Sequence, residues 1–451
     1  MPTYVILKES AMNTVSRYAH FFRSARGVGL LYNARSNAFA EIGDGMLKAL
    51  QEARSHPERI GALFTSEELE MLKRLKVVVE EGTDEEYVNI QKLQHYLSAF
   101  NQSQLVLTIA PTMDCNFRCT YCYEEQKPKV YMTEETEDAI VDFAKAHRLA
   151  KAVFVSWYGG EPLMNFKGMR RLMAKLKTID DKEIVHQSLV TNGYLLDESK
   201  HSFFREYPVR DVQFTLDGTR DVHNRLRLYH MPEIGTYDTV VRNMETFAAA
   251  FPETQVNLRI HVGPDTIGEF ENVCAAIASL RQRCPNINPY PGFITDYRQN
   301  CVLLDHQKVS DFFYEMYNKG VYNSGFYPKL NKGGCCATAI NSYVVGAEGE
   351  LYKCWVDVGN KQRAVGTIVG MKTLNEPLLA DYMVGSSMYD DPECRQCSLL
   401  PVCDGGCTIR RLRRDKDGLT TDLCTPLKNN LERNLEIHYR IRKNGKNHEE
   451  S

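Results

Sequence analysis

The sequence lacks the features that direct a chain into a membrane, through an export pathway or onto nucleic acid. We find no apolar run long enough to cross a bilayer, and the stretch MPTYVILKESAMN has no basic flank followed by an apolar core. The formal net charge of the 451 residues is only −3, which offers no broad attraction for nucleic acid or anionic membranes. We therefore expect a cytoplasmic protein without nucleic-acid or membrane partners.

Cysteine is missing from the first 114 residues and is then concentrated in two clusters. Three of the 14 cysteines lie in residues 115–122, and eight lie between residues 335 and 424. Stable disulfides are rare in a reducing compartment, so clustered cysteines there indicate metal ligands or redox groups.

Residues 1–95 mix strand-like and helical patterns. Two strand-like stretches and two stretches of helical periodicity lie at 3–9, 27–42, 43–53 and 65–78. We expect Ser66 to cap the last of these helices. This plan resembles the small winged-helix peptide-recognition domain that precedes peptide-modifying enzymes, and the alternative is a structural extension of the chain.

Residues 103–320 alternate between strand and helix patterns. Strands are predicted at 104–110, 152–158, 183–191, 211–217, 255–262 and 290–297. Helices are predicted between them, at 132–148, 166–178, 237–251 and 267–283. Six strands separated by helices predict an α/β fold with a parallel sheet and right-handed crossovers. The alternation fits both a doubly wound sheet and a partial barrel.

From residue 321 onward the regular patterns fade, and cysteines, glycines and turns dominate up to about residue 430. A polar helix is expected at 425–444. We treat 321–430 as a cysteine-rich domain and 431–451 as a C-terminal helix and tail.

The first cysteine cluster directly follows the first predicted strand of the alternating zone. Cys115, Cys119 and Cys122 therefore lie in a strand-to-helix loop, where parallel α/β folds build their sites. Two interpretations are open. The three thiolates could hold a structural zinc ion with a distant fourth ligand. They could instead hold three irons of a [4Fe–4S] cluster, whose fourth iron would bind a small molecule.

The following strand ends carry groups suited to binding such a molecule. The motifs GGEP, TNG and TLDG follow the next three strands in order. Gly159 and Gly160 allow close backbone approach, and Glu161 is an acceptor for an amino group. Arg227 could bind a carboxylate bidentately.

This series of motifs, with Tyr121 inside the Cys115-x3-Cys119-x2-Cys122 loop, resembles the radical S-adenosylmethionine (SAM) enzymes over about residues 103–320. The resemblance implies a partial (β/α)6 TIM-type barrel, and a [4Fe–4S] cluster whose fourth iron is bound by the amino and carboxylate groups of SAM. The SAM contacts that it implies are Gly159, Gly160 and Glu161 at the methionyl amine, Arg227 at the carboxylate, and Tyr121 and Ser188 near the nucleoside.

Such enzymes cleave SAM with one electron to produce a 5′-deoxyadenosyl radical, which removes a hydrogen atom from the substrate. The resemblance implies an electron donor such as flavodoxin or ferredoxin. We assign no catalytic residue, because no side chain in the sequence marks a general base for the substrate.

The C-terminal cysteines follow the pattern Cys-x12-Gly-x4-Cys, then Cys-x2-Cys-x5-Cys-x3-Cys, then a last Cys. A bare CxxC pair would suggest a zinc ribbon, but the whole pattern resembles the SPASM extension, which holds two auxiliary [4Fe–4S] clusters and brings the total to three. The resemblance gives the first auxiliary cluster Cys336, Cys354 and Cys407, with Cys335 or Cys301 as a possible fourth ligand. It gives the second auxiliary cluster Cys394, Cys397, Cys403 and Cys424.

SPASM proteins mostly modify peptides, so the resemblance implies a polypeptide substrate. One relative, the anaerobic sulfatase maturase, is expected to carry an Asp directly after the cysteine that corresponds to Cys354. Here that residue is Trp355, and the nearest acid is Asp357, which counts against sulfatase maturation.

We therefore expect a maturase that forms cysteine thioether crosslinks in a ribosomally synthesised precursor peptide, as sactipeptide and ranthipeptide maturases do. Residues 1–95 would bind the leader of this peptide by β-augmentation. The alternatives are a carbon–carbon or carbon–oxygen side-chain crosslink and a sulfatase-maturase-like oxidase. A metal-binding regulator that binds DNA is a non-enzymatic alternative, against which the near-neutral charge argues.

Overall fold

The computed structural model describes residues 12–122, 124, 128–296, 301–302, 304–322, 324–330, 334–418 and 422–449. The predicted strand at 3–9 lies outside these residues. Among the described residues, no helix has both the length and the apolar character needed to span a membrane.

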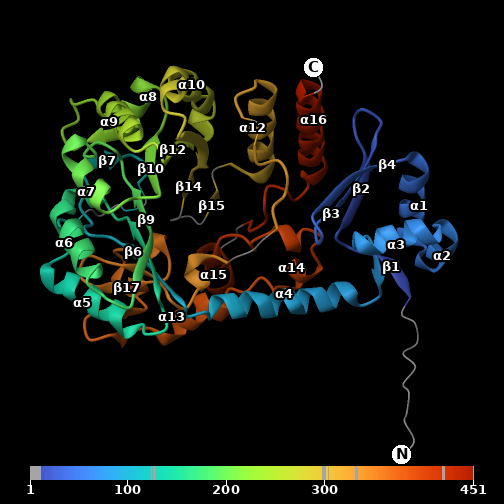
Figure 1. The fold of residues 1–451 in the computed structure, drawn as a ribbon, viewed down its shortest axis with the longest axis horizontal. Helices are drawn as coiled ribbons and strands as arrows, with labels where there is room; N and C mark the ends of the chain where they lie inside the picture. The colour runs from blue at the N-terminus through green and yellow to red at the C-terminus, as the bar shows by residue number, and fades with distance from the viewer. Residues whose placement is uncertain are drawn as a thin grey trace, which may run out of the picture.

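A ten-stranded sheet, called the central sheet below, lies in the left part of the view in Figure 1 and has the strand order β13-β12-β10-β9-β8-β6-β16-β17-β18-β19. All six predicted strands are present and pair in parallel. They are β6 (Gln104–Ile109), β8 (Ala152–Trp157), β9 (Glu183–Val190), β10 (Asp211–Leu216), β12 (Gln255–Val262) and β13 (Ile287–Phe293). The sheet has two different ends, so it does not close into a complete barrel.

Burial alternates along these strands because successive side chains point to opposite faces of the sheet. In β8, Val153, Val155 and Trp157 are buried while the residues between them are partly exposed. The sheet and its helices share one core. The helices that contribute to it are α5 (Glu134–Ala146), α6 (Phe166–Leu176), α7 (His201–Glu206), α9 (Tyr237–Ala250), α10 (Glu269–Ala276), α11 (Ala278–Arg283) and α12 (His306–Asn318). Helix α8 (Arg220–Leu226) follows β10 along the chain. The predicted helix at 267–283 is therefore two helices, α10 and α11.

The cysteine-rich segment extends the central sheet. Strand β16 (Ser342–Val345) pairs in parallel with β6, in a register that aligns Ser342 with Val106. An antiparallel meander follows, formed by β17 (Glu350–Tyr352), β18 (Gly366–Thr367) and β19 (Lys372–Thr373). The backbone groups on the outer side of β6 are thus paired, which removes an open sheet edge. The sequence patterns did not predict that a strand of the cysteine-rich segment would join the central sheet.

Short elements complete the C-terminal part of the chain. They are α13 (Glu376–Ala380), α14 (Pro392–Gln396), α15 (Thr408–Asp417) and α16 (Leu431–Glu449). Two further short ladders join β7 (Phe117–Cys119) to β11 (Arg227–Tyr229), and β14 (Thr295–Asp296) to β15 (Cys301–Val302).

The N-terminal unit contains a three-stranded antiparallel sheet, β2 (Ala19–Arg23), β3 (Gly29–Asn33) and β4 (Ala38–Ile42). Strand β1 (Asn13–Val15) pairs with β5 (Val78–Glu80), and the helices are α1 (Asp44–Ser55), α2 (Ile60–Leu63) and α3 (Ser66–Arg74).

The predicted cap at Ser66 is wrong. Thr65 is the extended residue before α3, and its hydroxyl accepts from Glu68 N at 3.2 Å, while Glu68 accepts from Thr65 N at 2.8 Å.

Helix α4 (Thr83–Ala99) runs from the N-terminal unit to the central sheet along the lower edge of the view in Figure 1. Its buried Asp84 accepts from Ser16 Oγ at 3.0 Å and from Arg17 N at 2.8 Å. Its buried Val88 belongs to a hydrophobic cluster that also contains Tyr32 of the N-terminal sheet, Leu400 of the cysteine-rich segment and Leu435 of α16. The N-terminal unit is therefore packed onto the C-terminal part of the chain.

Replacing Leu435 by Ala tests this packing. Leu435 is fully buried in the shared cluster, so the cavity left behind should lower the free energy of unfolding by about 3 kcal/mol. Chemical denaturation followed by circular dichroism measures the change. Leu97→Ala is the matched control, because Leu97 is 67% exposed on α4, and its effect should stay within about 0.5 kcal/mol. Equal effects of the two substitutions would contradict the assignment.

Candidate active site

The loop after β6 carries the three clustered thiols and is held in place from both sides. Asp114 accepts from Cys115 N at 2.8 Å and from Tyr131 Oη at 2.8 Å. The β7–β11 ladder aligns Cys119 with Arg227, which follows the TLDG turn along the chain. The thiol loop and the predicted carboxylate-binding residue are thus joined by backbone pairing.

The GGEP turn packs directly on the same loop. A Cβ atom on Gly160 would lie 2.2 Å from the carbonyl oxygen of Asp114, and one on Gly159 would lie 2.6 Å from that of Thr112. Gly159 also has a φ of 106°, in the region that favours glycine. Both glycines are therefore required by the close contact of the two loops.

A cavity of about 350 Å³ opens between these loops and the carboxyl ends of the strands. Most of the residues predicted to bind the cluster and SAM line this cavity, namely Cys115, Cys119, Tyr121, Cys122, Gly159, Gly160 and Arg227. Asn192 of the TNG motif and Thr215 of the TLDG motif line it too, and so do Gln213, Arg259 and His261, which the sequence analysis did not single out.

Glu161 and Ser188 do not line the cavity. Glu161 is fully buried behind it and accepts from Thr191 Oγ1 at 2.8 Å, Asn192 N at 2.8 Å and Leu163 N at 3.1 Å. Burial raises the pKa of Glu161 to about 7, against the lowering effect of these three donors. Ser188 donates to Ser156 Oγ at 2.8 Å. In this structure the hydrogen bonds of these two side chains stabilise the strands and turns that form the cavity wall.

Arg227 is the centre of a buried polar network. Its Nη1 donates to Tyr121 Oη at 2.8 Å and lies 3.6 Å from Asp217 Oδ1. His261 Nδ1 lies 2.8 Å from Tyr121 Oη and 3.1 Å from Asp217 Oδ1. Burial alone would raise the pKa of Asp217, but the charges of Arg227 and His261 prevail and lower it. The carboxylate therefore stays ionised and orients the guanidinium.

The side chains that line the cavity include thiols able to bind an iron–sulfur cluster and a guanidinium able to bind an anionic group. Arg227 Nε is buried and makes no hydrogen bond to any described residue, so it is available to a carboxylate. Cys115 Sγ accepts from Phe117 N at 3.4 Å. Thiolates are the ligands that hold [4Fe–4S] clusters, so the three cysteines fit such a cluster.

The four cysteines predicted for the second auxiliary cluster line one cavity of about 190 Å³. Each sulfur accepts one hydrogen bond, and the donors are Arg411 Nη2 to Cys394 at 3.5 Å, Leu399 N to Cys397 at 3.5 Å, Gly405 N to Cys403 at 3.4 Å and Lys428 Nζ to Cys424 at 3.1 Å. Two cations and two backbone amides compensate thiolate charge, so this donor set fits a [4Fe–4S] cluster.

The cysteines predicted for the first auxiliary cluster also come together. Burial and the negative field of Asp357, Cys407 and Cys335 raise the pKa of Cys354. The thiol of Cys335 is hydrogen-bonded to that of Cys336. The side chain of Cys301, the other proposed fourth ligand, lies outside the described part of the chain.

A buried ammonium lies beside this group of thiols. Lys353 is almost fully buried, and its Nζ donates to the carbonyl oxygens of Ala339 and Ser342, the latter at 2.6 Å. Burial lowers the pKa of Lys353 to about 7, while the thiols of Cys336 and Cys335 act to raise it. Lys353 therefore places a buried amine next to candidate thiolate ligands, whose negative charge favours its protonated form.

The comparisons with known proteins agree with this geometry. Residues 109–277 match the model of the Radical SAM superfamily. The cysteine-type anaerobic sulfatase-maturating enzyme of Clostridium perfringens (strain 13 / Type A) is 26% identical over 349 residues, which are 71% of this chain and 92% of that enzyme. The serine-type enzyme of Bacteroides thetaiotaomicron is 23% identical over 349 residues, which are 67% of this chain and 82% of that enzyme.

A solved structure shares the fold. The structure of native anSMEcpe with bound AdoMet and the Kp18Cys peptide matches with a TM-score of 0.57 at 21% identity, over 76% of this chain and 99% of that chain. The chain therefore contains a radical SAM domain with the α/β fold of these enzymes. It is a radical SAM enzyme that binds SAM and a [4Fe–4S] cluster, as the sequence motifs predicted.

Replacing Arg227 by Lys tests the predicted carboxylate contact. Lysine keeps the charge but loses the planar fork, so SAM affinity should fall at least tenfold, which corresponds to the loss of about 1.5 kcal/mol from one charge-assisted hydrogen bond. Anaerobic equilibrium dialysis with reconstituted protein measures the affinity. Arg225→Lys, at an exposed position of the preceding helix α8, should leave it unchanged. Unchanged affinity in both variants would remove Arg227 from the SAM site.

Proposed function

We propose that this radical SAM enzyme forms cysteine thioether crosslinks in a ribosomally synthesised precursor peptide. One observation carries the proposal. Cys354 is a candidate ligand of an auxiliary cluster, and the next two residues, Trp355 and Val356, line the cavity that contains the three loop thiols. A substrate bound in this cavity would therefore contact the segment that carries an auxiliary-cluster ligand.

Polar and apolar side chains both line the cavity. Arg227, Asn192 and Thr215 are polar and suit SAM, while Trp355 and Tyr158 form an apolar wall. The Trp355 ring packs on Tyr158, with ring centroids 4.6 Å apart. The apolar wall would hold a peptide side chain and exclude water from the reacting carbon.

Held by Cys115, Cys119, Cys122 and Arg227, the loop cluster and SAM would supply the removal of one hydrogen atom from the peptide carbon, and an auxiliary cluster would supply the acceptor for the second electron. One C–H and one S–H bond are thereby replaced by one C–S bond, and the thiol proton passes to solvent. The residues of this chain would position the peptide carbon and sulfur and keep the site dry.

The environment of Asp357 supports crosslinking over sulfatase maturation. Asp357 is buried outside the cavity lining, where it accepts from Arg363 Nε at 3.2 Å and from Tyr382 Oη. Burial raises the pKa of Asp357, and the Arg363 guanidinium beside it lowers it. The acid nearest to the expected base position is thus engaged with structural partners, and Trp355 occupies the cavity wall.

We further propose three functional domains: a winged-helix-like leader-binding domain at 1–95, a radical SAM partial barrel at 103–320, and a SPASM domain at 321–430 with two auxiliary clusters. The three-stranded sheet with helices α1–α3 supports the first assignment. Its outer strands β2 and β4 offer edges for a leader strand. An electron carrier such as flavodoxin or ferredoxin would supply the reducing electron.

A second candidate function is sulfatase maturation. Its support is the similarity to the Clostridium perfringens sulfatase-maturating enzyme over 71% of this chain. A carbon–carbon or carbon–oxygen peptide crosslink on the same machinery is a third product that the cavity would accommodate.

Anaerobic incubation with SAM, a reductant and a cysteine-rich precursor peptide distinguishes these functions. Thioether formation should release 5′-deoxyadenosine, remove two hydrogens per crosslink from the peptide mass and consume one thiol, as measured by iodoacetamide alkylation. The triple variant Cys115→Ala/Cys119→Ala/Cys122→Ala is the inactive control. Loss of hydrogens with all thiols still alkylated would identify a carbon–carbon or carbon–oxygen crosslink. If the enzyme modified a cysteine-containing sulfatase peptide but not the precursor peptide, it would be a sulfatase maturase.

Substitution of Trp355 tests the apolar wall. Trp355→Ala removes the ring pair with Tyr158, which is worth about 1 kcal/mol, so kcat/KM for the peptide should fall about fivefold. 5′-Deoxyadenosine release without peptide should persist, because the polar residues that suit SAM are unchanged. Trp355→Phe is the matched control and should retain most of the peptide activity. A parallel loss of both activities in Trp355→Ala would contradict a role in peptide binding.

A further inference from the structure

Strands β10 and β12 line one side of the active-site cavity with polar side chains. Along β12 every second residue from 256 to 262 is buried and the residues between them are partly exposed, because successive side chains point to opposite faces of the sheet. Arg259 and His261 therefore share a face, and both line the cavity together with Gln213 and Thr215 of β10. In the ladder of the two strands, Thr215 is the pairing partner of Arg259. Arg259 is thus a cavity residue next to His261 of the Arg227 network.

The side chain of Arg259 lies over a glycine of the next strand. Parallel pairing of β12 with β13 aligns Arg259 with Tyr290 and His261 with Gly292. A Cβ atom on Gly292 would overlap Arg259 Nε and lie 2.8 Å from Arg259 Cγ. Gly292 is not among the glycines with positive φ, so the position calls for glycine because of space and not because of backbone conformation. The absence of a side chain at Gly292 gives the guanidinium its place at the cavity.

The guanidinium of Arg259 has a neutral partner but no carboxylate. Tyr290 Oη donates to Gln213 Oε1 at 2.6 Å and is hydrogen-bonded to Arg259. Arg259 Nε is buried and makes no hydrogen bond to any residue in the described part of the chain. Among the described residues that line the cavity, Glu124 is the one acid, and it forms no ion pair with Arg259. Partial burial of a guanidinium without an opposite charge is unfavourable, so a bound anion would stabilise it.

SAM does not supply this anion. Its one carboxylate is assigned to Arg227, which donates to Tyr121 Oη and lies 3.6 Å from Asp217 Oδ1. The sulfonium of SAM is positive, so a second guanidinium repels it. The anion that suits Arg259 therefore belongs to another molecule in the cavity. A carboxylate fits best, because it accepts two parallel hydrogen bonds from a guanidinium.

We propose that Arg259 binds a carboxylate of the precursor peptide and thereby selects peptides with a negative charge close to the reacting carbon. This inference rests on the proposed function, which supplies the peptide. The carboxylate belongs to an acidic side chain or to the C-terminus of the peptide. The peptide is then held at two points of one cavity, by charge at Arg259 and by apolar contact at Trp355 and Tyr158. Two fixed points orient the reacting carbon better than one.

Affinity selection with synthetic peptides tests the carboxylate site. The sample is the full-length reconstituted protein with SAM, kept anaerobic. The probes are three pools of N-acetylated nonapeptides that contain a central cysteine and otherwise uncharged residues. The first pool carries one glutamate and an amidated C-terminus, the second carries glutamine instead, and the third is the glutamine pool with a free C-terminus. Ultrafiltration followed by mass spectrometry measures the retained fraction of each pool.

The glutamate pool or the free-carboxylate pool should be retained about tenfold better than the amidated glutamine pool, as expected for one charge-assisted contact. The pool that is retained identifies the source of the carboxylate. This comparison needs no substitution, so it stands even where a variant does not fold. Equal retention of the three pools, or retention of none, would overturn the inference.

Substitutions then locate the binding group. Arg259→Gln should abolish the preference among the pools, while equilibrium dialysis should give the same SAM affinity. Gly292→Ala should reduce the preference although the guanidinium is still present, because the added Cβ displaces Arg259 Nε. Arg242→Gln is the matched control, because it removes the same charge at an exposed position of α9, and it should keep the preference. A preference that persists in Arg259→Gln, or a parallel loss of SAM affinity, would contradict the proposal.

The crosslinking assay with the precursor peptide separates this inference from the proposed function. There Arg259→Gln should raise KM about tenfold and change kcat less than twofold, because the contact is made equally before and during the reaction. Crosslinking by the unsubstituted enzyme with equal retention of the pools would remove the carboxylate site and keep the proposed function. An Arg259-dependent preference without any crosslinking would keep the site and overturn the proposed function.

Discussion

The parallel pairing of β16 with β6 is the constraint on which the arrangement of the whole molecule depends. Strand β6 leads into the thiol loop, and β16 leads through β17 to Cys354 and Trp355. Hydrogen bonding between the two strands therefore fixes the cysteine-rich segment against the central sheet, beside the thiol loop. Because of this pairing, Trp355 lines the same cavity as the three loop thiols, although more than 230 residues separate them.

Around that cavity, burial disfavours charged side chains, whereas neighbouring opposite charges stabilise them. The balance decides which side chains are ionised there. Asp217 and Arg227 are both buried, and each would be costly to bury alone. Together with Tyr121 and His261 they form a network that keeps the guanidinium charged and oriented. The buried Glu161 plays a comparable part, because its carboxylate accepts hydrogen bonds from three donors of the surrounding turns. These polar side chains are preorganised before SAM arrives.

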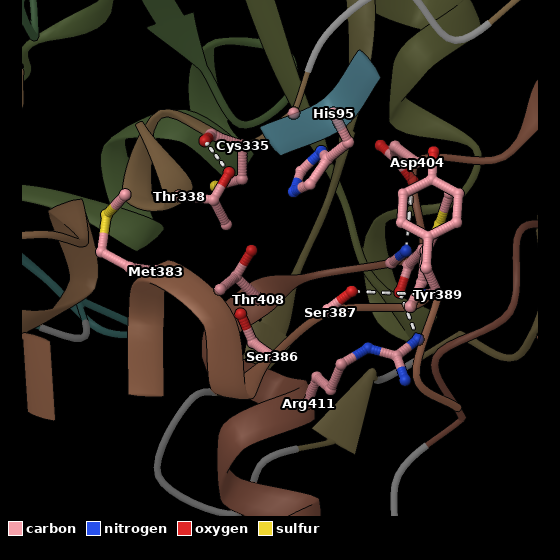
Figure 2. Close-up of a pocket in the computed structure, with 14 residues that line it drawn as sticks. His95, Cys335, Thr338, Met383, Ser386, Ser387, Tyr389, Asp404, Thr408 and Arg411 are labelled. Atoms are coloured by element: carbon pink, nitrogen blue, oxygen red, sulfur yellow. Dashed lines mark hydrogen bonds between the residues drawn. The ribbon is translucent and has the colours of Figure 1, made fainter. Parts of the chain in front are cut away.

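The N-terminal unit is joined to the rest through helix α4 and the hydrophobic cluster that contains Val88, Tyr32 and Leu435. A peptide leader bound to this unit would thus sit on a surface that is packed directly against the cysteine-rich segment. The same helix carries His95 to a small cavity that Cys335 also lines (Figure 2). Leader recognition and the redox groups are, on our proposals, parts of one packed structure.

The sequence by itself determined the elements whose signal is local. Alternating burial in strands such as β8 and β12, and the spacing of the loop cysteines, depend on neighbouring positions, so both were predictable. The tertiary structure alone decided the pairing of β16, the cavity positions of His261 and Trp355, the burial of Glu161 and the approach of His95 to Cys335. These features arise from contacts between residues far apart in the chain, and no local pattern records which distant backbone or side chain will meet a given residue. The N-cap of α3 is Thr65 and not the predicted Ser66, because the cap is the residue that stays extended directly before the helix.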